Sequence, residues 1–201
     1  YIAIFPAEME SFSLTFTASD GQNTYKSSDK PLTIKRNYVT SLGDVKGGEY
    51  PYITFTAESS QKFKISQGFF YLYYSVGDSD WQSVKANTEV EFGGSKGNLR
   101  LRGGNDKNKN TNGTCYSNIT TTISFTENNV PVSCKGDIRT LIDWENYATV
   151  ETEDAKFSKL FYGCSVLTSA PDLPSKNLSS KCYYSMFYGC TGLTTAPALP
   201  A

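Results

Sequence analysis

Apolar and polar side chains alternate with a period of two over much of the chain, a pattern typical of strands with one buried face. Two such stretches lie near the N-terminus and are marked by Phe12, Leu14, Phe16, Leu32 and Ile34. Turn-forming residues between them, at positions 19–23, favour a hairpin. Three or so strands are too few for an independent core. Residues 1–46 therefore either pack on the rest of the chain or are the closing strands of a larger β-sandwich.

A second β-rich stretch comes after a glycine-containing linker at residues 43–48. Its predicted strands are marked by Ile53 and Phe55, Phe63 and Ile65, the run 69–76, Val90 and Phe92, Leu99 and Leu101, and Ile123 and Phe125. Turn residues separate these strands at the spacing of a small sandwich or barrel. We expect a β-domain over residues 47–140. From Ile138 the spacing becomes loosely helical, with Asp137 as a candidate N-cap.

The last part of the chain, residues 141–201, contains an internal repeat with a period of 26 residues. Residues 161–174 read FYGCSVLTSAPDLP and residues 187–200 read FYGCTGLTTAPALP, so ten of fourteen positions are identical. A 26-residue period lies in the range of leucine-rich repeats. In each repeat unit the pattern predicts a short strand and a helical return, which in the second unit lie near residues 193–196 and 181–187. The apolar face of a unit is buried when a neighbouring unit stacks on it. The predicted fold class is mostly β: small β-sandwich-like domains followed by a short leucine-rich repeat segment of the α/β solenoid type.

Composition narrows the range of functions. The chain has 201 residues, a formal net charge of −1 and no histidine. Without histidine, Ser-His-Asp and Cys-His catalytic devices and the commonest zinc ligand sets are not available. The near-neutral charge gives no electrostatic basis for binding nucleic acid, and no apolar run reaches the roughly 18 residues of a membrane helix. We expect a binding protein with no enzymatic activity, no cofactor and no metal site.

Five cysteines are an odd number, which does not describe a closed disulfide framework. Cys115 and Cys134 are the one candidate disulfide. Cys164 and Cys190 occupy the same position of successive repeats and are expected to form a buried, reduced ladder.

Exposed aromatic and hydroxyl side chains mark the candidate binding surface. In the aromatic run 69–74, alternate residues face outward, where another segment covers them or they form a stacking platform for a sugar or a partner protein. Solvent-facing repeat positions extend this surface. The candidate ligand-binding residues are Phe69, Tyr71, Tyr73, Thr168, Tyr184, Thr194 and Thr195. Trp81 is interpreted as a core residue rather than as a sugar-stacking shelf.

Glu89 and Glu91 lie on one face of a predicted strand. Paired carboxylates are the catalytic groups of glycosidases. Charged residues two apart are also a common protection of an edge strand against aggregation, and we favour that interpretation.

The repeat resembles that of a known family. Residues 182–197, with the core Tyr-Ser-Met-Phe-Tyr-Gly-Cys-Thr-Gly-Leu, resemble the repeat of BspA-type leucine-rich repeat surface proteins of gut and oral anaerobic bacteria. Residues 52–141, through 74–81 and 134–138, are similar to the β-domain that precedes the repeats in that family. Residues 1–45, with 32–37 near their end, are similar to the closing strands of a fimbrillin-like sandwich.

This resemblance implies a secreted or lipid-anchored protein on the extracellular side of the outer membrane, with any anchor outside this chain. The family is associated with adhesion to a host extracellular-matrix protein or glycan. The chain departs from the family in having barely two repeats, so the first unit is expected to cap the β-domain and the C-terminal repeat edge to invite self-association. A structural spacer without a ligand and, more remotely, a carbohydrate-active enzyme are the alternatives.

Overall fold

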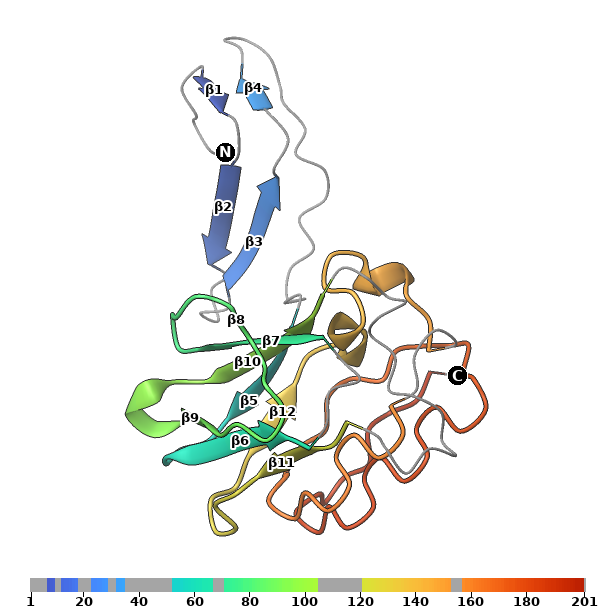
Figure 1. Cartoon of the computed structure of the whole chain (residues 1–201). Coiled ribbons are helices and arrows are strands. Elements are labelled where there is room, and N and C mark those ends of the chain that lie inside the picture. Colours follow the sequence, from blue (N-terminus) through green and yellow to red (C-terminus); the bar gives the residue numbers. More distant parts are fainter. Residues whose placement is uncertain are drawn as a thin grey trace. The chain divides into compact units, whose positions relative to one another are not determined.

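The chain forms two compact units, Tyr1–Tyr50 and Pro51–Ala201. The computed structural model describes strand backbones at 7–9, 12–17, 23–28 and 32–34, and residues 52–66, 71–104, 121–152 and 157–200 with their side chains. These parts are mostly β, with antiparallel sheets and short 3₁₀ helices (Figure 1). The mostly-β class predicted from the period-two pattern is thus confirmed.

In the first unit, two strand pairs are nested along the chain. The inner pair joins β2 (Phe12–Thr17) to β3 (Asn23–Ser28), and the outer pair joins β1 (Ala7–Met9) to β4 (Leu32–Ile34). The strands predicted around Phe12–Phe16 and Leu32–Ile34 are present. The likeness of this unit to a fimbrillin sandwich stays a prediction.

The second unit contains two antiparallel sheets. The five-stranded sheet has the order β12-β5-β10-β7-β8, and the three-stranded sheet has the order β11-β6-β9. Their bounds are β5 (Ile53–Thr56), β6 (Gln61–Ile65), β7 (Leu72–Val76), β8 (Gln82–Ser83), β9 (Val90–Phe92), β10 (Leu99–Gly103), β11 (Ile123–Phe125) and β12 (Ser133–Lys135). Every strand predicted in this region is present, while β8 and β12 were not predicted because they are short and mostly polar.

The core of the second unit extends from the sheets into the repeat segment. In β6 and β10, every second residue is buried, as the alternation requires. Phe55 of β5 packs edge-on against Phe125 of β11, with ring centroids 5.3 Å apart, and against Phe161 of the repeat at 6.2 Å. The hydrophobic core is therefore continuous across residue 140, where the sequence analysis placed a domain boundary. The assignment of residues 47–140 to a β-domain and of residues 141–201 to a leucine-rich repeat segment stays a prediction.

Helical structure is limited to short 3₁₀ segments within the described ranges. They are η1 (Gly94–Lys96), η2 (Ile138–Leu141) and η3 (Tyr147–Thr149). Asp137 caps η2 by accepting a hydrogen bond from the Arg139 N–H at 2.8 Å, which confirms the predicted cap. No helix in the part described is long and apolar enough to cross a membrane.

Two local predictions for the repeat are wrong. Residues 181–187 form successive turns rather than a helix, and residues 193–196 form no strand. A positive φ at Lys181, Ser185 and Gly189 interrupts the helical path at every fourth residue. Pro197, directly after the second segment, also lacks the N–H that a sheet partner would need.

Candidate binding surface

The first repeat docks beside β12 of the five-stranded sheet. Isolated parallel bridges join Val132 to Leu167 and Asp137 to Asp172. The Ser169 hydroxyl donates to the Cys134 carbonyl at 2.8 Å and accepts from its N–H at 2.9 Å. The first repeat thus packs against β12, at the place where the sequence analysis expects a repeat cap.

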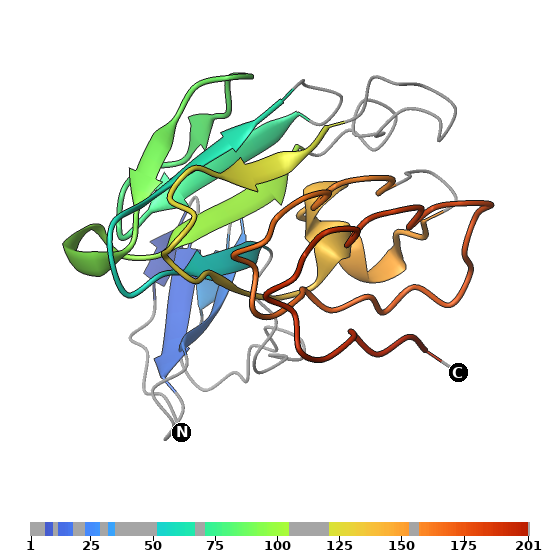
Figure 2. The same cartoon turned by 90° about the horizontal axis from the view of Figure 1, so that it is seen from below.

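The second repeat stacks on the first at the 26-residue period. We call residues 157–164 the first coil and residues 183–190 the second coil. Figures 1 and 2 both show the orange and red segments that contain these coils running side by side. Three ring pairs stack at this spacing: Phe157 on Tyr183 at 6.0 Å, Phe161 on Phe187 at 5.6 Å, and Tyr162 on Tyr188 at 5.0 Å between centroids. The sequence repeat is therefore also a repeat of side-chain positions.

The backbone follows the same period. Lys159 and Ser185 have φ of 57° and 50°, and Gly163 and Gly189 both have φ of 76°. A Cβ on Gly189 would lie 3.3 Å from the Gly163 Cα, so this position keeps the coils in close approach. The two coils therefore have the same backbone conformation at these positions.

Hydrogen bonds in the first coil alternate between two directions. Every second N–H bonds within its own turn, as from Tyr162 to the Lys159 carbonyl at 3.1 Å. The others donate across to the second coil: Lys159 to the Tyr184 carbonyl at 2.9 Å, Phe161 to Met186 at 3.1 Å, and Gly163 to Tyr188 at 2.8 Å. The coils are therefore joined by a ladder of backbone bonds as well as by stacked rings.

The repeat cysteines are buried free thiols. The Cys164 thiol donates to the Ile123 carbonyl at 2.8 Å, and the Cys190 thiol donates to the Phe161 carbonyl at 2.9 Å. Burial raises the pKa of the Cys164 thiol to about 12 and raises that of Cys190 as well. Both side chains are therefore protonated and structural at neutral pH, as the predicted reduced ladder requires.

The candidate disulfide stays a prediction. Cys134 is a buried free thiol, and burial raises its pKa well above the ordinary value. Cys115 lies outside the described residues.

The predicted ligand-binding residues fall into two separate groups. Tyr71 and Tyr73, at β7, are exposed as predicted, by 62% and 39% respectively, while Phe69 lies outside the described residues. The repeat docks beside β12, and three strand spacings, about 14 Å, separate β12 from β7 in the sheet order. The structure therefore does not gather the tyrosines of β7 and those of the repeats into one site.

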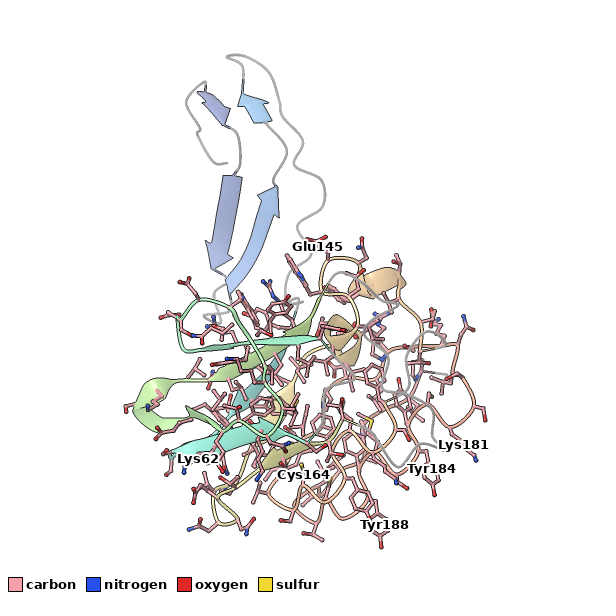
Figure 3. All side chains as sticks on the ribbon, in the orientation of Figure 1. Lys62, Glu145, Cys164, Lys181, Tyr184 and Tyr188 are labelled. Carbon is pink, nitrogen blue, oxygen red and sulfur yellow. The ribbon has the colours of Figure 1, made fainter. Side chains whose placement is uncertain are left out.

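The repeat hydroxyls differ in their surroundings. The Thr168 hydroxyl donates to the Val132 carbonyl at 3.1 Å, so it helps to hold the first repeat on the β-domain. Thr194 and Thr195 are exposed, as is Tyr184. In Figure 3, Tyr184 and Tyr188 lie at the periphery of the molecule, whereas Cys164 lies among packed side chains.

Tyr162 and Tyr188 are the exposed aromatics that the sequence analysis did not single out. Their side chains are 44% and 65% exposed, and their rings stack at 13° to one another. We call this pair the tyrosine ladder. The signal that could have found this pair is the tyrosine at the second position of the repeated FYGC motif, next to a phenylalanine that packs inward in both copies.

A groove with several polar side chains in its lining lies beside the first repeat. It has a volume of about 370 Å³ and is lined by Thr56, Glu58, Ser59, Asn129, Val130, Pro131, Ser133 and Thr168. A smaller hollow of about 190 Å³ shares Asn129, Pro131 and Thr168 and reaches Ser165 and Gly192. Carboxylate, amide and hydroxyl groups of this kind can hydrogen-bond the hydroxyls of a sugar. Sequence reasoning missed this groove because its lining comes from three segments that are far apart in the sequence.

Glu89 and Glu91 each pair with a different lysine. Lys62 lies 3.4 Å from Glu89, and Lys96 lies 2.9 Å from Glu91. A hydrogen bond from Ser60, together with Lys96, lowers the pKa of the Glu91 carboxyl. A glycosidase general acid needs the opposite shift. Among the residues that the structure describes, no three histidine, cysteine, aspartate or glutamate side chains lie together as metal ligands.

Trp81 belongs to a stack of cations and rings. The Arg102 guanidinium lies 4.0 Å from the ring centroids of both Trp81 and Trp144, and Tyr52 lies 5.6 Å from Trp81. These contacts hold Trp81 in a packed structural cluster. It is half-buried rather than fully internal.

The chain was compared with protein-family models, curated proteins and solved structures. No protein-family model, curated protein or solved structure matches this chain.

Proposed function

We propose that this chain is a binding module of a bacterial surface protein, which recognises a host extracellular-matrix protein or glycan without catalysis. The observation that carries the proposal is the tyrosine ladder, in which two exposed rings stack 5.0 Å apart at the 26-residue repeat. Exposed aromatic patches usually mark interaction sites. Tyrosine also supplies a large contact area at low entropic cost, because its ring has few rotatable bonds.

The groove supports a glycan as one class of ligand. Ser165, which lines the smaller hollow, lies three residues after Tyr162, so their Cα atoms are within about 11 Å. A short oligosaccharide can span that distance. It would stack a sugar face on a ring of the ladder and direct its hydroxyls to the amides and carboxylate of the groove.

The repeat geometry supports an assignment to leucine-rich repeat arrays of the BspA type. The common φ values, the ring stacks and the backbone ladder all follow the 26-residue period of the sequence. A solenoid of this kind presents the same weak contact once per repeat and gains avidity along the array. We place the protein on the extracellular side of the outer membrane, and we assign residues 1–46 to a fimbrillin-like sandwich.

Two observations support binding over chemistry. The carboxylates of Glu89 and Glu91 are engaged with separate lysines, and the Glu91 pKa is lowered. The rings of Tyr162 and Tyr188, by contrast, are exposed to solvent. A spacer without a ligand is the second proposal, and it is distinguished by the absence of any saturable binding.

A binding screen of the purified chain tests the proposal. Host extracellular-matrix proteins and host glycans are immobilised side by side, and the wild type is compared with a Tyr162→Ala/Tyr188→Ala variant. A Tyr71→Ala/Tyr73→Ala variant is the matched control, because it also removes two exposed tyrosines. We expect saturable binding that the ladder variant loses and the β7 variant keeps. Absence of binding would favour the spacer, and loss in the β7 variant alone would move the site to the β-domain.

A further inference from the structure

One buried glutamine holds the turn that carries the asparagines of the groove. Asn128 and Asn129 lie at the centre of this turn, which is closed by a hydrogen bond from the Val130 N–H to the Glu127 carbonyl at 3.2 Å. The Gln61 side chain is fully buried and donates to the Glu127 and Val130 carbonyls at 2.9 and 3.1 Å. Its oxygen accepts from the Glu127 N–H at 2.9 Å. A buried amide with its bonds satisfied in this way fixes the turn before any ligand binds.

Several polar side chains in the lining of the groove are available to a ligand. Within the described residues, no hydrogen bond or ion pair engages the side chains of Glu58, Ser59, Asn129 and Ser133. The Thr168 hydroxyl, by contrast, is bound to the Val132 carbonyl and belongs to the wall of the groove. The groove therefore combines a fixed frame with unpaired donors and acceptors, an arrangement that recognises hydroxyl groups at low entropic cost.

The charge of the lining is negative. Among the described residues that line the groove and the smaller hollow, Glu58 alone carries a charge. Two lysines near it in the sequence, Lys62 and Lys96, each form an ion pair with another glutamate, and Lys135 of β12 lies outside both linings. An anionic sugar in the groove would therefore meet a like charge, and no cation of the lining would balance it.

We propose that the groove binds the uncharged end of a glycan and rejects sugars that carry a carboxylate or sulfate group. This inference rests on the proposed function and names the class of glycan. Neutral sugar hydroxyls can donate to the Glu58 carboxylate and can accept from the Asn129 amide. The volume of about 370 Å³ is at the lower end of the range for small-ligand sites, roughly 300–1,000 Å³, and suits a short terminal part of a glycan.

The proposed class separates two kinds of host glycan. Glycosaminoglycans of the extracellular matrix carry carboxylate or sulfate groups along their chains, and sialylated glycans carry a carboxylate at their ends. Glycans that end in galactose or N-acetylgalactosamine present only neutral hydroxyl and amide groups there. The charge of the groove therefore favours the neutral ends.

Matched pairs of immobilised glycans test this inference. Each pair consists of a neutral glycan that ends in galactose or N-acetylgalactosamine and the same glycan after oxidation of its terminal C6 hydroxyl to a carboxylate. We expect the wild type to bind a neutral glycan saturably and its oxidised form at least about fivefold more weakly at low salt. In Glu58→Gln, which keeps an oxygen acceptor, the two forms should bind within about twofold of each other. The matched control Glu145→Gln removes an exposed carboxylate outside both linings and should discriminate as the wild type does.

A second variant locates the binding in the groove. Asn129→Ala removes an amide of the lining and should weaken binding of the neutral glycan at least about threefold. Asn177→Ala removes an exposed asparagine outside both linings and should leave the affinity unchanged. In the wild type, the side-chain amide resonances of Asn129 should shift saturably as the neutral glycan is added.

Three results would overturn this inference and leave the proposed function intact. The first is equal or tighter binding of the oxidised glycan by the wild type, or discrimination that survives in Glu58→Gln. The second is saturable binding of a matrix protein without binding of any neutral glycan. The third is unchanged affinity in Asn129→Ala, which would move the site away from the groove. No saturable binding of any ligand would overturn the proposed function together with this inference.

Discussion

Two glycines 26 residues apart share one backbone conformation but have different neighbours. Gly163 and Gly189 both have φ of 76°, where a side chain costs about 1–2 kcal/mol. Among the described residues, a Cβ on Gly163 would meet no atom within 4 Å, whereas one on Gly189 would lie 3.3 Å from the Gly163 Cα. Substitution of Gly163 therefore measures the free-energy cost of backbone strain alone, whereas substitution of Gly189 adds the cost of pushing the two coils apart.

We expect Gly189→Ala to lower the free energy of unfolding by more than Gly163→Ala. The second substitution should cost about 1–2 kcal/mol through strain alone, and the first adds the contact with the neighbouring coil. Urea denaturation of the two variants measures the difference. Equal losses would contradict the close approach of the coils.

The buried thiol of Cys164 predicts a loss of stability at high pH. Its pKa is about 12 in the folded protein because of burial, whereas a thiol in the unfolded chain titrates near 8.5. Above that value the unfolded state releases the proton and the folded state does not, so the stability falls as the pH rises from about 8.5 to 12.

Urea denaturation at pH 7 and pH 10 checks this expectation. The wild type should lose more stability between the two pH values than Cys164→Ala does, although the variant is less stable at pH 7 through loss of packing. An equal pH dependence in both proteins would show that the thiol ionises in the folded state.

At the scale of elements, the strands with regular alternation could be predicted, and the two edge strands of the five-stranded sheet, β8 and β12, could not. Phe63 and Ile65 of β6 and Leu99 and Leu101 of β10 are buried as the period-two pattern requires. The strand β12 has no such signal because its neighbours, and not its own sequence, place it beside the first repeat.

The coils and the groove show why the rest was missed. Lys159 and Ser185 adopt a positive φ although they are not glycine, so nothing local distinguishes these turns from a helix. The groove joins Glu58, Asn129 and Thr168 from distant segments. Only the tertiary fold brings them together, and one sequence carries no record of that proximity.

The cap of η2 provides a prediction for a single element. Asp137 accepts from the Arg139 N–H and forms an ion pair with the Arg139 guanidinium at 2.7 Å, with both side chains largely buried. Asp137→Ala should cost about 3 kcal/mol, because it removes the cap and takes the carboxylate away from a largely buried guanidinium.

The variant Asp137→Asn is the matched control. Its amide oxygen can still cap the helix, so thermal unfolding should show a smaller loss than for Asp137→Ala. Similar losses in both variants would assign the stability to the ion pair rather than to the cap.

At the scale of the second unit, the β-domain and the repeats share one core. Phe161 of the first coil contacts Phe55 of β5 and stacks on Phe187 of the second coil. Such continuity predicts that residues 51–201 unfold together rather than sheet and repeat in turn.

We expect Phe161→Ala to destabilise the whole second unit by about 3–5 kcal/mol. Fluorescence of Trp81 and Trp144, which lie outside the repeats, and near-ultraviolet circular dichroism of the tyrosines should report the same shifted transition. An unchanged tryptophan transition alongside early loss of the tyrosine signal would contradict a shared core.

The most direct test of the proposed function is the affinity of three proteins for the ligand identified in the screen. Tyr188→Phe keeps the stacked ring and removes its hydroxyl, whereas Tyr188→Ala removes the ring of the more exposed ladder tyrosine. We predict that Tyr188→Phe stays within about twofold of the wild type and that Tyr188→Ala weakens binding at least about fivefold, or roughly 1 kcal/mol. An unchanged Kd for Tyr188→Ala would contradict the assignment of the tyrosine ladder as the binding surface.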